Sequence, residues 1–396
     1  MMSQISDPAD AIRGNEPGSF AENVLTDRHP ALIRQVAEAH PYPPEIQARL
    51  GALDATLAGV IPPLDHPWQA AGQPAHHRYT GQRWLDVPWL TAEALFYRTL
   101  LEAVGYYQEG PWRGIDPFEP QKTAELAAPD LTDELTGLRT LLELPMADAL
   151  RSATDAAVWA NRADLGFGLS DPSARHRERV DELLVDDSHA LWTYVHDAQP
   201  RRIAVIADNA GRELLADLVW IDRMLANGHA TQVDLHVKPD PYFISDATTL
   251  DVLAALRRLA SVRGAGSTIA DRLRTCISTG KLAVRTHPFW CTFWSFDHLP
   301  DDLVADLAGC ELTVIKGDLN YRKLVGDRHW PATTAFADLT SYFPTPLVTF
   351  RTCKSDVVVG LTAHQLATLD ATGQPWRTNG THAMIQANLN PADDPH

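Results

Sequence analysis

The sequence predicts an α/β protein with a largely parallel sheet, preceded by a mainly helical N-terminal region. Three observations lead to this prediction. From residue 200 onward short apolar runs alternate with helical segments, the first of these runs is apolar throughout, and helical spacing of apolar residues dominates before residue 200. With 396 residues, 45% of them hydrophobic, the chain can bury a large core without disulfides or structural metals.

The N-terminal part is expected to be a loose leader over residues 1–28 followed by a mainly helical region over 29–195. Residues 1–28 are polar and are punctuated by glycine and proline. The Pro- and His-rich stretch 61–83 is too broken for regular structure and predicts a long ordered loop. Apolar residues at helical spacing predict helices in three segments: 31–57, interrupted by prolines at 41, 43 and 44, then 89–107 and 132–160.

The region 196–390 is expected to contain the sheet. The run Ile203–Ala207 is apolar at every position, which is typical of a central strand covered on both faces. In residues 232–237 apolar and polar side chains alternate, which predicts a half-exposed strand. A helix over residues 214–225 is expected between these two strands. The remaining short apolar runs predict strands at Leu282–Val284, Leu312–Ile315, Leu347–Phe350 and Val357–Val359.

Composition excludes several classes of protein. Lys and Arg total 34 against 51 Asp and Glu, and the net charge of -17 disfavours binding to nucleic acid or to anionic lipid. The four cysteines form no CxxC pair, so neither a zinc ribbon nor a disulfide framework is indicated. No apolar segment resembles a signal peptide or approaches the roughly 18 residues of a membrane span. We therefore expect a cytoplasmic protein with small-molecule partners; the sequence indicates no oligomeric state.

Polar side chains follow four of the predicted strands directly. Because the carboxyl ends of parallel strands meet at one edge of a sheet, where ligands bind in open α/β sheets, we expect these side chains to share a site. They are Asp208, Asn209 and Glu213 after the first strand, Asp246 after the second, Lys316, Asp318, Asn320, Arg322 and Lys323 after the run at 312–315, and Arg351 and Lys354 after the run at 347–350.

The residue types indicate metal-assisted phosphate chemistry. The carboxylates of Asp208 and Asp246 and the amide oxygen of Asn209 are hard ligands, which suit Mg²⁺ or Mn²⁺ better than zinc. Cationic side chains from the same edge are suited to hold phosphoryl oxygens. These cations are Lys316, Arg322, Arg351 and Lys354. The expected ligand is a phosphate monoester held in a locally positive pocket on an otherwise negative protein.

Simpler explanations compete with this hypothesis for every residue. Asp208 or Asn209 could cap the helix that follows, Asp246 could cap the next one, and the cations could be surface residues in salt bridges. The aromatic stretch 287–294 favours core or loop packing over a platform for stacking sugars. What favours the site hypothesis is the joint occurrence of these side chains on one sheet edge.

Beyond these arguments, a series of motifs that includes WLTAEALFYR at 89–98, KGDLNYRKL at 316–324 and RTCK at 351–354 carries a resemblance. Through these motifs the chain resembles the DUF89 family of metal-dependent damage-control phosphatases, within it the acidic residue methyltransferase 1-like subfamily. The resemblance extends from about Trp89 to Ile385, and KGDLNYRKL followed by an RTxK motif is its most specific part. The motifs that carry it are WLTAEALFYR at 89–98, WANRADL at 159–165, LLVDD at 183–187, DNAGRELLADL at 208–218, KPDPYFISD at 238–246, HPFW at 287–290, KGDLNYRKLVGDRHW at 316–330 and RTCK at 351–354.

The resemblance implies a Rossmann-like, three-layer α/β/α domain with an appended helical region. It also implies a phosphatase acting on sugar phosphates such as fructose phosphates, with Mn²⁺, Co²⁺ or Ni²⁺ favoured. Asp208, Asn209 and Asp246 would be the metal ligands. Substrate contacts would come from Asp208, Asn209, Glu213, Asp318, Leu319, Asn320, Tyr321, Arg322 and Lys354. Lys316 and Arg351 are expected as phosphate contacts from the strand-edge chemistry alone.

The sequence hypothesis is thus a phosphomonoester hydrolase dependent on Mn²⁺, Co²⁺, Ni²⁺ or Mg²⁺, with residues 196–390 as its metal-binding domain. Asp208, Asp246 and Asp318 are the expected catalytic residues, with Asp318 positioning or deprotonating the attacking water. Asp208 as a covalent nucleophile stays open. Two alternatives are an S-adenosylmethionine-dependent carboxyl methyltransferase, disfavoured because no glycine-rich turn follows the first strand, and a non-catalytic sugar-phosphate binding module.

Overall fold

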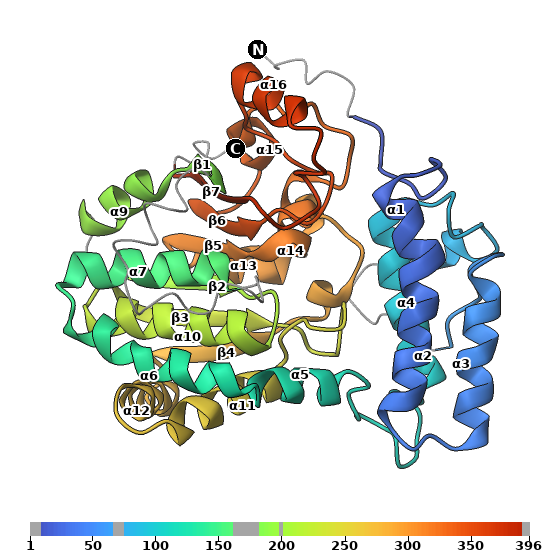
Figure 1. Cartoon of the computed structure of the whole chain (residues 1–396), viewed down its shortest axis with the longest axis horizontal. Helices are drawn as coiled ribbons and strands as arrows, with labels where there is room; N and C mark the ends of the chain where they lie inside the picture. The colour runs from blue at the N-terminus through green and yellow to red at the C-terminus, as the bar shows by residue number, and fades with distance from the viewer. Residues whose placement is uncertain (1–8, 66–74, 161–181, 198–200, 390–396) are drawn as a thin grey trace.

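A seven-stranded mixed sheet organises the chain, in the order β1-β7-β6-β5-β2-β3-β4 (Figure 1). The computed structural model describes residues 9–65, 75–160, 182–197 and 201–389. Strands β2 to β6 run parallel, while β7 is antiparallel to β6 and parallel to β1. The strands are β1 (Leu183–Asp186), β2 (Arg201–Ile206), β3 (Ala230–Val237), β4 (Leu282–Thr286), β5 (Leu312–Lys316), β6 (Leu347–Thr352) and β7 (Ala383–Asn388).

Helices cover both faces of this sheet. Successive residues of a strand point to opposite faces, so apolar side chains of one strand can pack into two cores. In β2, Ile203 and Val205 pack into one core while Ala204 and Ile206 pack into the other. The first core is covered by α5 (Glu119–Leu126), α6 (Pro129–Glu143), α7 (Met146–Trp159), α9 (Ser188–Asp197), α10 (Gly211–Ala226), α11 (Thr249–Ser261) and α12 (Ala265–Ser278). The second is covered by α13 (Asp301–Ala308), α14 (Gly317–Val325) and α15 (Phe336–Thr340). The predicted three-layer α/β/α class is therefore confirmed.

The N-terminal helices form a block beside the sheet (Figure 1, blue and cyan). They pack on the second core through residues such as Leu32, Leu50 and Phe96. The helices are α1 (Phe20–Asn23), the π-helical turn Val24–Arg28, α2 (His29–Ala39), α3 (Pro44–Thr56) and α4 (Trp89–Ala103). Helix α2 ends before the prolines at 41 and 43, and α3 begins at Pro44, as the sequence predicts.

Two N-terminal expectations differ from the structure. The predicted loose leader contains α1 and the π-helical turn, and Leu25 of this turn is buried in the second core. The apolar residues of its described part, 9–28, are few, but several of them are buried in the second core, so this part has regular structure despite its polar composition. The mainly helical range 29–195 also contributes β1, which pairs with β7. Residues 66–74 of the predicted loop, residues 1–8 and residues 161–165 of one quoted motif lie outside the described residues.

The strand predictions are correct for five of the six apolar runs. The sixth run, Val357–Val359, forms no strand, because its backbone pairs with none of the described strands. Its side chains are nevertheless buried in the core. Strand β3 is not half-exposed, since Asp234 and His236 are both buried. The guanidinium of Arg202 donates to Asp234 from β2, so a polar residue occupies an interior position through ion pairing. Strand β7 was not predicted from the sequence.

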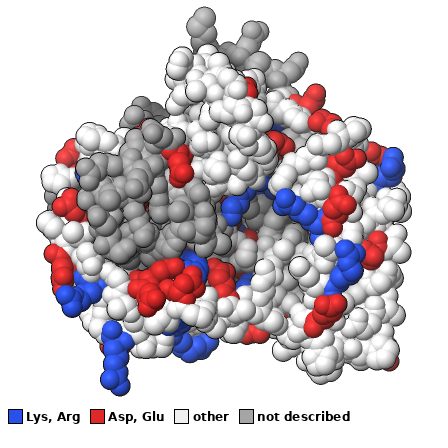
Figure 2. Space-filling model, viewed as in Figure 1, with Lys and Arg blue, Asp and Glu red and all other residues white. Residues whose placement is uncertain are grey.

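Further elements complete the second face and the surface. Two short 3₁₀ turns, Pro288–Cys291 and Phe296–His298, bury Phe289, Trp290 and Phe296, so the aromatic stretch packs as expected. Helix α16 (Ala363–Ala371) lies near the C-terminus. On the described surface of one face, acidic and basic side chains are interspersed (Figure 2). Within the described ranges, no helix has the length and apolar character needed to cross a membrane.

Candidate active site

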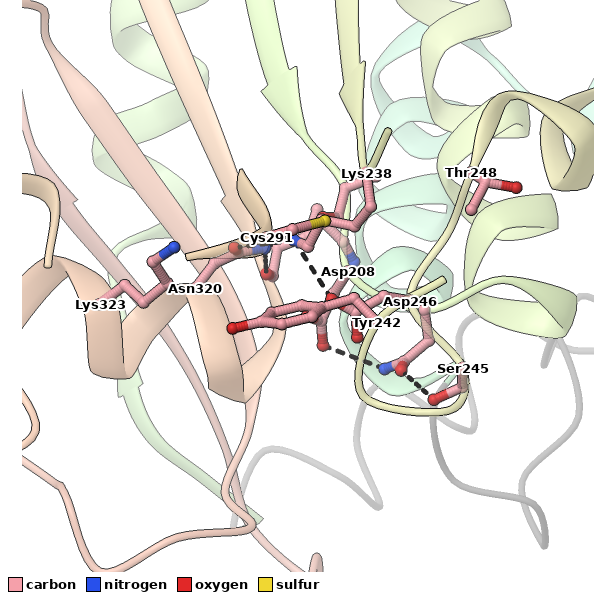
Figure 3. Close-up of polar contacts among 12 residues, drawn as sticks. Asp208, Lys238, Tyr242, Ser245, Asp246, Thr248, Cys291, Asn320 and Lys323 are labelled. Carbon is pink, nitrogen blue, oxygen red and sulfur yellow. Dashed lines mark hydrogen bonds and ion pairs between the residues drawn. The ribbon is translucent and has the colours of Figure 1, made fainter. Parts of the chain in front are cut away.

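The C-terminal end of β2 is joined to the loop after β3 by backbone hydrogen bonds. The amide of Ala210 donates to the carbonyl of Ser245 (2.6 Å), and the amide of Ala247 donates to the carbonyl of Asp208 (2.7 Å). These two bonds bring Asp208 and Asp246, 38 positions apart in the sequence, to the same place at the sheet edge (Figure 3). The predicted convergence of these strand-end residues therefore occurs.

The loop that carries Asp246 has a strained backbone. Phe243 and Ile244 have φ values of 44° and 67°, the left-handed region that non-glycine residues rarely adopt. Each such residue costs on the order of 1–3 kcal/mol, and strain of this kind is concentrated at functional sites. Phe243 stacks on Tyr97 of α4 with ring centroids 4.8 Å apart, so the N-terminal block helps to hold this conformation.

Asp208 is a buried carboxylate with an unused oxygen. Its Oδ2 accepts a hydrogen bond from Asn209 Nδ2 (3.0 Å), whereas Oδ1 has no hydrogen-bond partner among the described residues. Burial, followed by the charges of Asp246 and Glu213, raises the pKa of Asp208 well above its ordinary value. A buried carboxylate with an unsatisfied oxygen is costly unless a cation or a donor reaches it.

Asp246 is the second buried carboxylate, and Lys238 is its counter-ion. The Lys238 ammonium group lies 3.3 Å from Asp246 Oδ2 and donates to Asn320 Oδ1, also at 3.3 Å (Figure 3). Burial raises the pKa of Asp246 to about 6, although Lys238 opposes the shift. The lysine thus compensates part of the negative charge that two adjacent aspartates concentrate here.

The orientation of Asn209 is fixed by three neighbours. The Ser245 hydroxyl donates to Asn209 Oδ1, and Asn209 Nδ2 donates to Asp208 and to Glu213 Oε2 (2.8 Å). A carbonyl oxygen has two lone pairs, so Oδ1 keeps one acceptor position after binding Ser245.

Asp318 is held in its ionised form. Its Oδ1 accepts from Arg351 Nε (2.8 Å) and from the backbone amide of Lys354 (3.1 Å). Burial opposes ionisation, but Arg351 and then Arg322 outweigh it and lower the pKa of Asp318. Asp318 therefore orients the RTCK segment, and it is a weaker base than an ordinary aspartate.

Arg322 is anchored between two carboxylates. It donates through Nε to Asp327 Oδ1 (2.8 Å), through Nη2 to Asp327 Oδ2 (3.1 Å) and through Nη1 to Glu93 Oε2 (2.9 Å). Its guanidinium also lies 3.8 Å from the ring centroid of Trp89. Two helices from distant parts of the sequence, α4 and α14, are connected by this arginine.

These residues border a pocket of about 350 Å³. Four carboxylates and three cationic side chains line it, so the lining has no excess of basic residues, contrary to the locally positive pocket expected from the sequence. Two of the three metal-ligand candidates, Asp208 and Asp246, are acids, and Glu93 and Asp318 line the same pocket. The lining consists of Phe20, Val24, Arg28, His29, Leu32, Trp89, Glu93, Tyr97, Asp208, Asn209, Phe243, Ile244, Ser245, Asp246, Asp318, Leu319, Arg322 and Lys354.

Five predicted substrate contacts lie behind this lining. Lys316 donates to the Ala157 carbonyl and forms ion pairs with Asp217 (2.9 Å) and Glu213 (3.4 Å). Its ammonium charge is therefore neutralised by buried carboxylates. Arg351 is buried against Asp318, and its guanidinium lies 4.0 Å from the Tyr321 ring centroid. This geometry gives Lys316 and Arg351 no direct contact with a ligand in the pocket. The five residues are Glu213, Lys316, Asn320, Tyr321 and Arg351.

Asn320 and Tyr321, which do not line the pocket, form hydrogen bonds that hold the strands beneath it. Asn320 Nδ2 donates to the carbonyls of Ala207 (3.0 Å) and Lys316 (2.8 Å), which fixes the ends of β2 and β5. The Tyr321 hydroxyl donates to Gln386 Oε1 of β7 (2.8 Å).

The capping alternatives are excluded by the local geometry. Ala210 occupies the N-cap position of α10, so neither Asp208 nor Asn209 caps that helix. Helix α11 is capped by Thr248, whose backbone and side chain engage Asp251 in a capping box. Asp246 is therefore not needed for helix capping.

The donor set fits a hard divalent cation. Burial raises the pKa of both carboxylates, and the charge of Asp246 raises that of Asp208 further. Asp208 Oδ1 has no hydrogen-bond partner among the described residues, and Asn209 Oδ1 retains an acceptor position. Mg²⁺ and Mn²⁺ are bound in proteins by few oxygen ligands of this kind together with water. In the described part of the chain, no three His, Cys, Asp or Glu side chains are grouped so that they could hold a metal ion. The expected ligand set contains only two side chains of these types, because its third member is Asn209.

The N-terminal block supplies pocket residues that the sequence did not single out. Glu93 and Tyr97 of α4 line the pocket, as do Arg28 and His29. Glu93 lies within the quoted motif at 89–98, but nothing in the sequence indicates that this helix reaches the sheet edge. His29 is buried with its ring stacked on Phe96, and burial lowers its pKa to about 3, which keeps it neutral.

Comparison with known proteins extends these observations. A family model described as damage-control phosphatase ARMT1-like domain matches residues 24–369. The protein named damage-control phosphatase ARMT1 from Danio rerio is 31% identical over 76% of this chain and 74% of its own length, and its Homo sapiens counterpart is 29% identical over 77% and 75%. A crystal structure of a DUF89 family protein from Pyrococcus horikoshii shares the fold, with a TM-score of 0.51 at 15% identity over 92% of this chain and 97% of that one.

Proposed function

Because the chain belongs to the damage-control phosphatase ARMT1-like family, we propose that it hydrolyses small phosphomonoesters in a reaction that depends on a divalent metal ion. The observation that carries the proposal is the pair of buried carboxylates, Asp208 and Asp246, at the C-terminal edge of a parallel sheet beside a pocket of about 350 Å³. Sugar phosphates such as fructose phosphates are the first substrates to consider, and a pocket of this size can hold one.

Asp208, Asn209 and Asp246 would hold the metal, with Mn²⁺, Co²⁺, Ni²⁺ or Mg²⁺ as candidates. A divalent ion bound there would supply Lewis-acid polarisation of the phosphoryl group. It would also add two positive charges to a pocket whose lining has one carboxylate more than it has cations. This added charge supports an anionic substrate better than the lining alone does.

The chain's own residues position the reacting groups. Lys238 neutralises part of the charge of Asp246, and Ser245 fixes the amide of Asn209. Asp318 orients the backbone at Lys354, whose side chain lines the pocket, and Arg322 presents a rigid cation there. We assign the phosphoryl oxygens to Lys354 and Arg322, because these two cations border both the carboxylates and the free volume.

A phosphate-release screen tests the proposal. The purified chain is incubated with sugar and nucleotide monophosphates and each of the four metal ions, and released phosphate is measured. We expect turnover with at least one metal, abolished by EDTA and reduced at least about a hundredfold in Asp208→Asn. Asp240→Asn is the matched control, because Asp240 lies in the same loop as Asp246 but its carboxylate binds Tyr107 (3.1 Å) and Arg98 (3.6 Å).

Two results would contradict phosphatase function. Absence of phosphate release with every metal, together with tight binding of a sugar phosphate in calorimetry, would indicate a binding module. Micromolar binding of S-adenosylmethionine without phosphate release would instead favour carboxyl methyl transfer.

A further inference from the structure

Four carboxylates border the pocket, and their surroundings divide them into three kinds. Asp208 and Asp246 lie together at the sheet edge and suit a metal ion. Asp318 is bound to Arg351 and to the Lys354 amide, which keeps it ionised. Glu93 remains, and it comes from the N-terminal block, a different part of the fold. Groups in one site whose environments push their pKa values apart commonly serve different catalytic roles.

The surroundings of Glu93 favour its protonated form near neutral pH. Among the described residues its hydrogen-bond partner is Arg322, whose charge is already matched by the bidentate contact with Asp327. Burial raises the pKa of Glu93 to about 7; Arg322 opposes the shift, while Asp327 and Asp318 add to it. A carboxyl group that gains and loses a proton near the working pH is suited to general acid–base catalysis.

Glu93 also borders the pocket in which the proposed reaction would take place. It lines the same pocket as Asp208 and Asp246. The charges of Glu93 and Asp246 both act on the hydroxyl of Tyr97, which raises the pKa of that phenol further after burial has raised it. Tyr97 therefore has two acidic neighbours: Glu93, on its own helix α4, and Asp246, at the sheet edge across the pocket. A substrate bound at this sheet edge would face α4.

We propose that Glu93 is the general acid that protonates the leaving alcohol oxygen of the substrate, an inference that rests on the proposed phosphatase function. In this step the bond between phosphorus and the ester oxygen breaks, and its electron pair stays on that oxygen, which takes the proton from Glu93. The oxygen of water forms the new bond to phosphorus and releases one proton to solvent, from which the Glu93 carboxylate is reprotonated. The products are an alcohol and inorganic phosphate.

The need for such an acid depends on the leaving group. A sugar or alkyl alkoxide is strongly basic and leaves slowly unless it is protonated, whereas p-nitrophenolate is a weak base and leaves without help. General acid catalysis contributes about 10²–10⁴-fold to a rate. Glu93 should therefore matter for alkyl phosphates and little for aryl phosphates.

The test compares Glu93→Gln with the wild type on an alkyl phosphate that the screen identifies as a substrate and on p-nitrophenyl phosphate. We expect kcat/KM for the alkyl ester to fall by about a hundredfold or more, and that for the aryl ester to fall by less than about fivefold. For the alkyl ester, kcat of the wild type should decline as pH rises through about 7, and this decline should be absent in the variant.

Asp327→Asn is the matched control, because Asp327 is the other carboxylate that binds Arg322. A misplaced Arg322 would weaken turnover of both esters to the same extent, so this variant should lower both values in parallel. Parallel losses in Glu93→Gln as well would overturn the proposal and leave Glu93 as a positioning residue for Arg322.

Failure of this inference is distinguishable from failure of the proposed function. If the wild type releases no phosphate from any ester, the function itself is wrong; if it does and Glu93→Gln spares the alkyl ester, only the acid assignment is wrong. Should Glu93→Gln not fold, a wild-type series of esters decides the question. A shallow dependence of kcat/KM on leaving-group basicity supports the general acid, and a steep dependence contradicts it.

Discussion

At the residue scale, Gly317 determines whether Asp208 can occupy its position. It starts α14 directly after β5 with φ of 79°, a backbone conformation that a residue with a Cβ adopts only at a cost. A Cβ at this position would overlap the Asp208 carboxylate. The glycine is thus required twice, once for the turn and once for the close approach of the carboxylate.

Gly317→Ala should therefore abolish most phosphate release and also lower stability. The left-handed backbone alone costs roughly 1–2 kcal/mol, and displacement of Asp208 disrupts the carboxylate pair in addition. Thermal melting and the phosphate-release assay measure the two effects. Gly326→Ala is the control, because Gly326 ends the same helix with φ of 85° but has its nearest neighbour, Arg328 Cδ, at 3.6 Å. Equal loss of activity in both variants would contradict the role of close approach.

The residues that the sequence could identify are those placed by strand ends. Asp208, Asn209 and Asp246 were predictable because parallel strands deliver their following residues to one edge whatever the details of packing. Lys316 and Arg351 satisfied the same rule, but their long side chains turn inward to Asp217 and Asp318. The position of a strand predicts where the residues that follow it lie. It does not predict which carboxylate a flexible lysine or arginine side chain will contact.

At the element scale, the loop between β3 and α11 depends on a buried lysine of α5. Lys122 Nζ donates to the carbonyl of Asp246 (3.1 Å) and forms ion pairs with Asp116 (3.0 Å) and Asp251 (3.0 Å). Asp251 belongs to the capping box of α11, so one ammonium group ties the start of a helix and the loop that carries Asp246 to the N-terminal half of the chain.

Lys122→Met should destabilise the fold by about 3–5 kcal/mol, because it leaves two largely buried carboxylates without their cation. Urea denaturation measures the free energy of unfolding. Lys281→Met, a change at an exposed lysine, is the control and should stay within about 0.5 kcal/mol of the wild type. A change in Lys122→Met as small as that of the control would show that the three contacts do not hold the loop.

The N-terminal elements also show the limit of prediction from sequence. Helical spacing identified α4 because apolar periodicity is local. Glu93 of α4 reaches the pocket because of the way the N-terminal block packs on the sheet. No local sequence pattern predicts this packing. Strand β7 and the irregular run Val357–Val359 differ from expectation for the same reason, since strand pairing and core filling are decided by distant partners.

At the scale of the whole molecule, the carboxylate pair would link the proposed metal binding to folding stability. Because burial raises the pKa of Asp246 to about 6, protonation of this carboxyl stabilises the metal-free fold fully below the ordinary aspartate pKa. That stabilisation is lost as pH rises through about 6. At neutral pH the metal-free protein therefore contains the buried charge of Asp246 beside Asp208, and a divalent cation would offset it.

Mn²⁺ should accordingly raise the melting temperature at pH 7.5, and much less at pH 5, where protons compete for the same oxygens. At a free concentration 100 times Kd, binding to the folded state alone contributes about 2.7 kcal/mol. Differential scanning fluorimetry measures the shift without reference to turnover. Asp246→Asn should show little shift, whereas Asp240→Asn, in the same loop but bound to Tyr107, should respond as the wild type does. A wild-type melting temperature unaffected by all four candidate ions at pH 7.5 would contradict the metal site, since no ion that binds these carboxylates can leave the folding equilibrium unchanged.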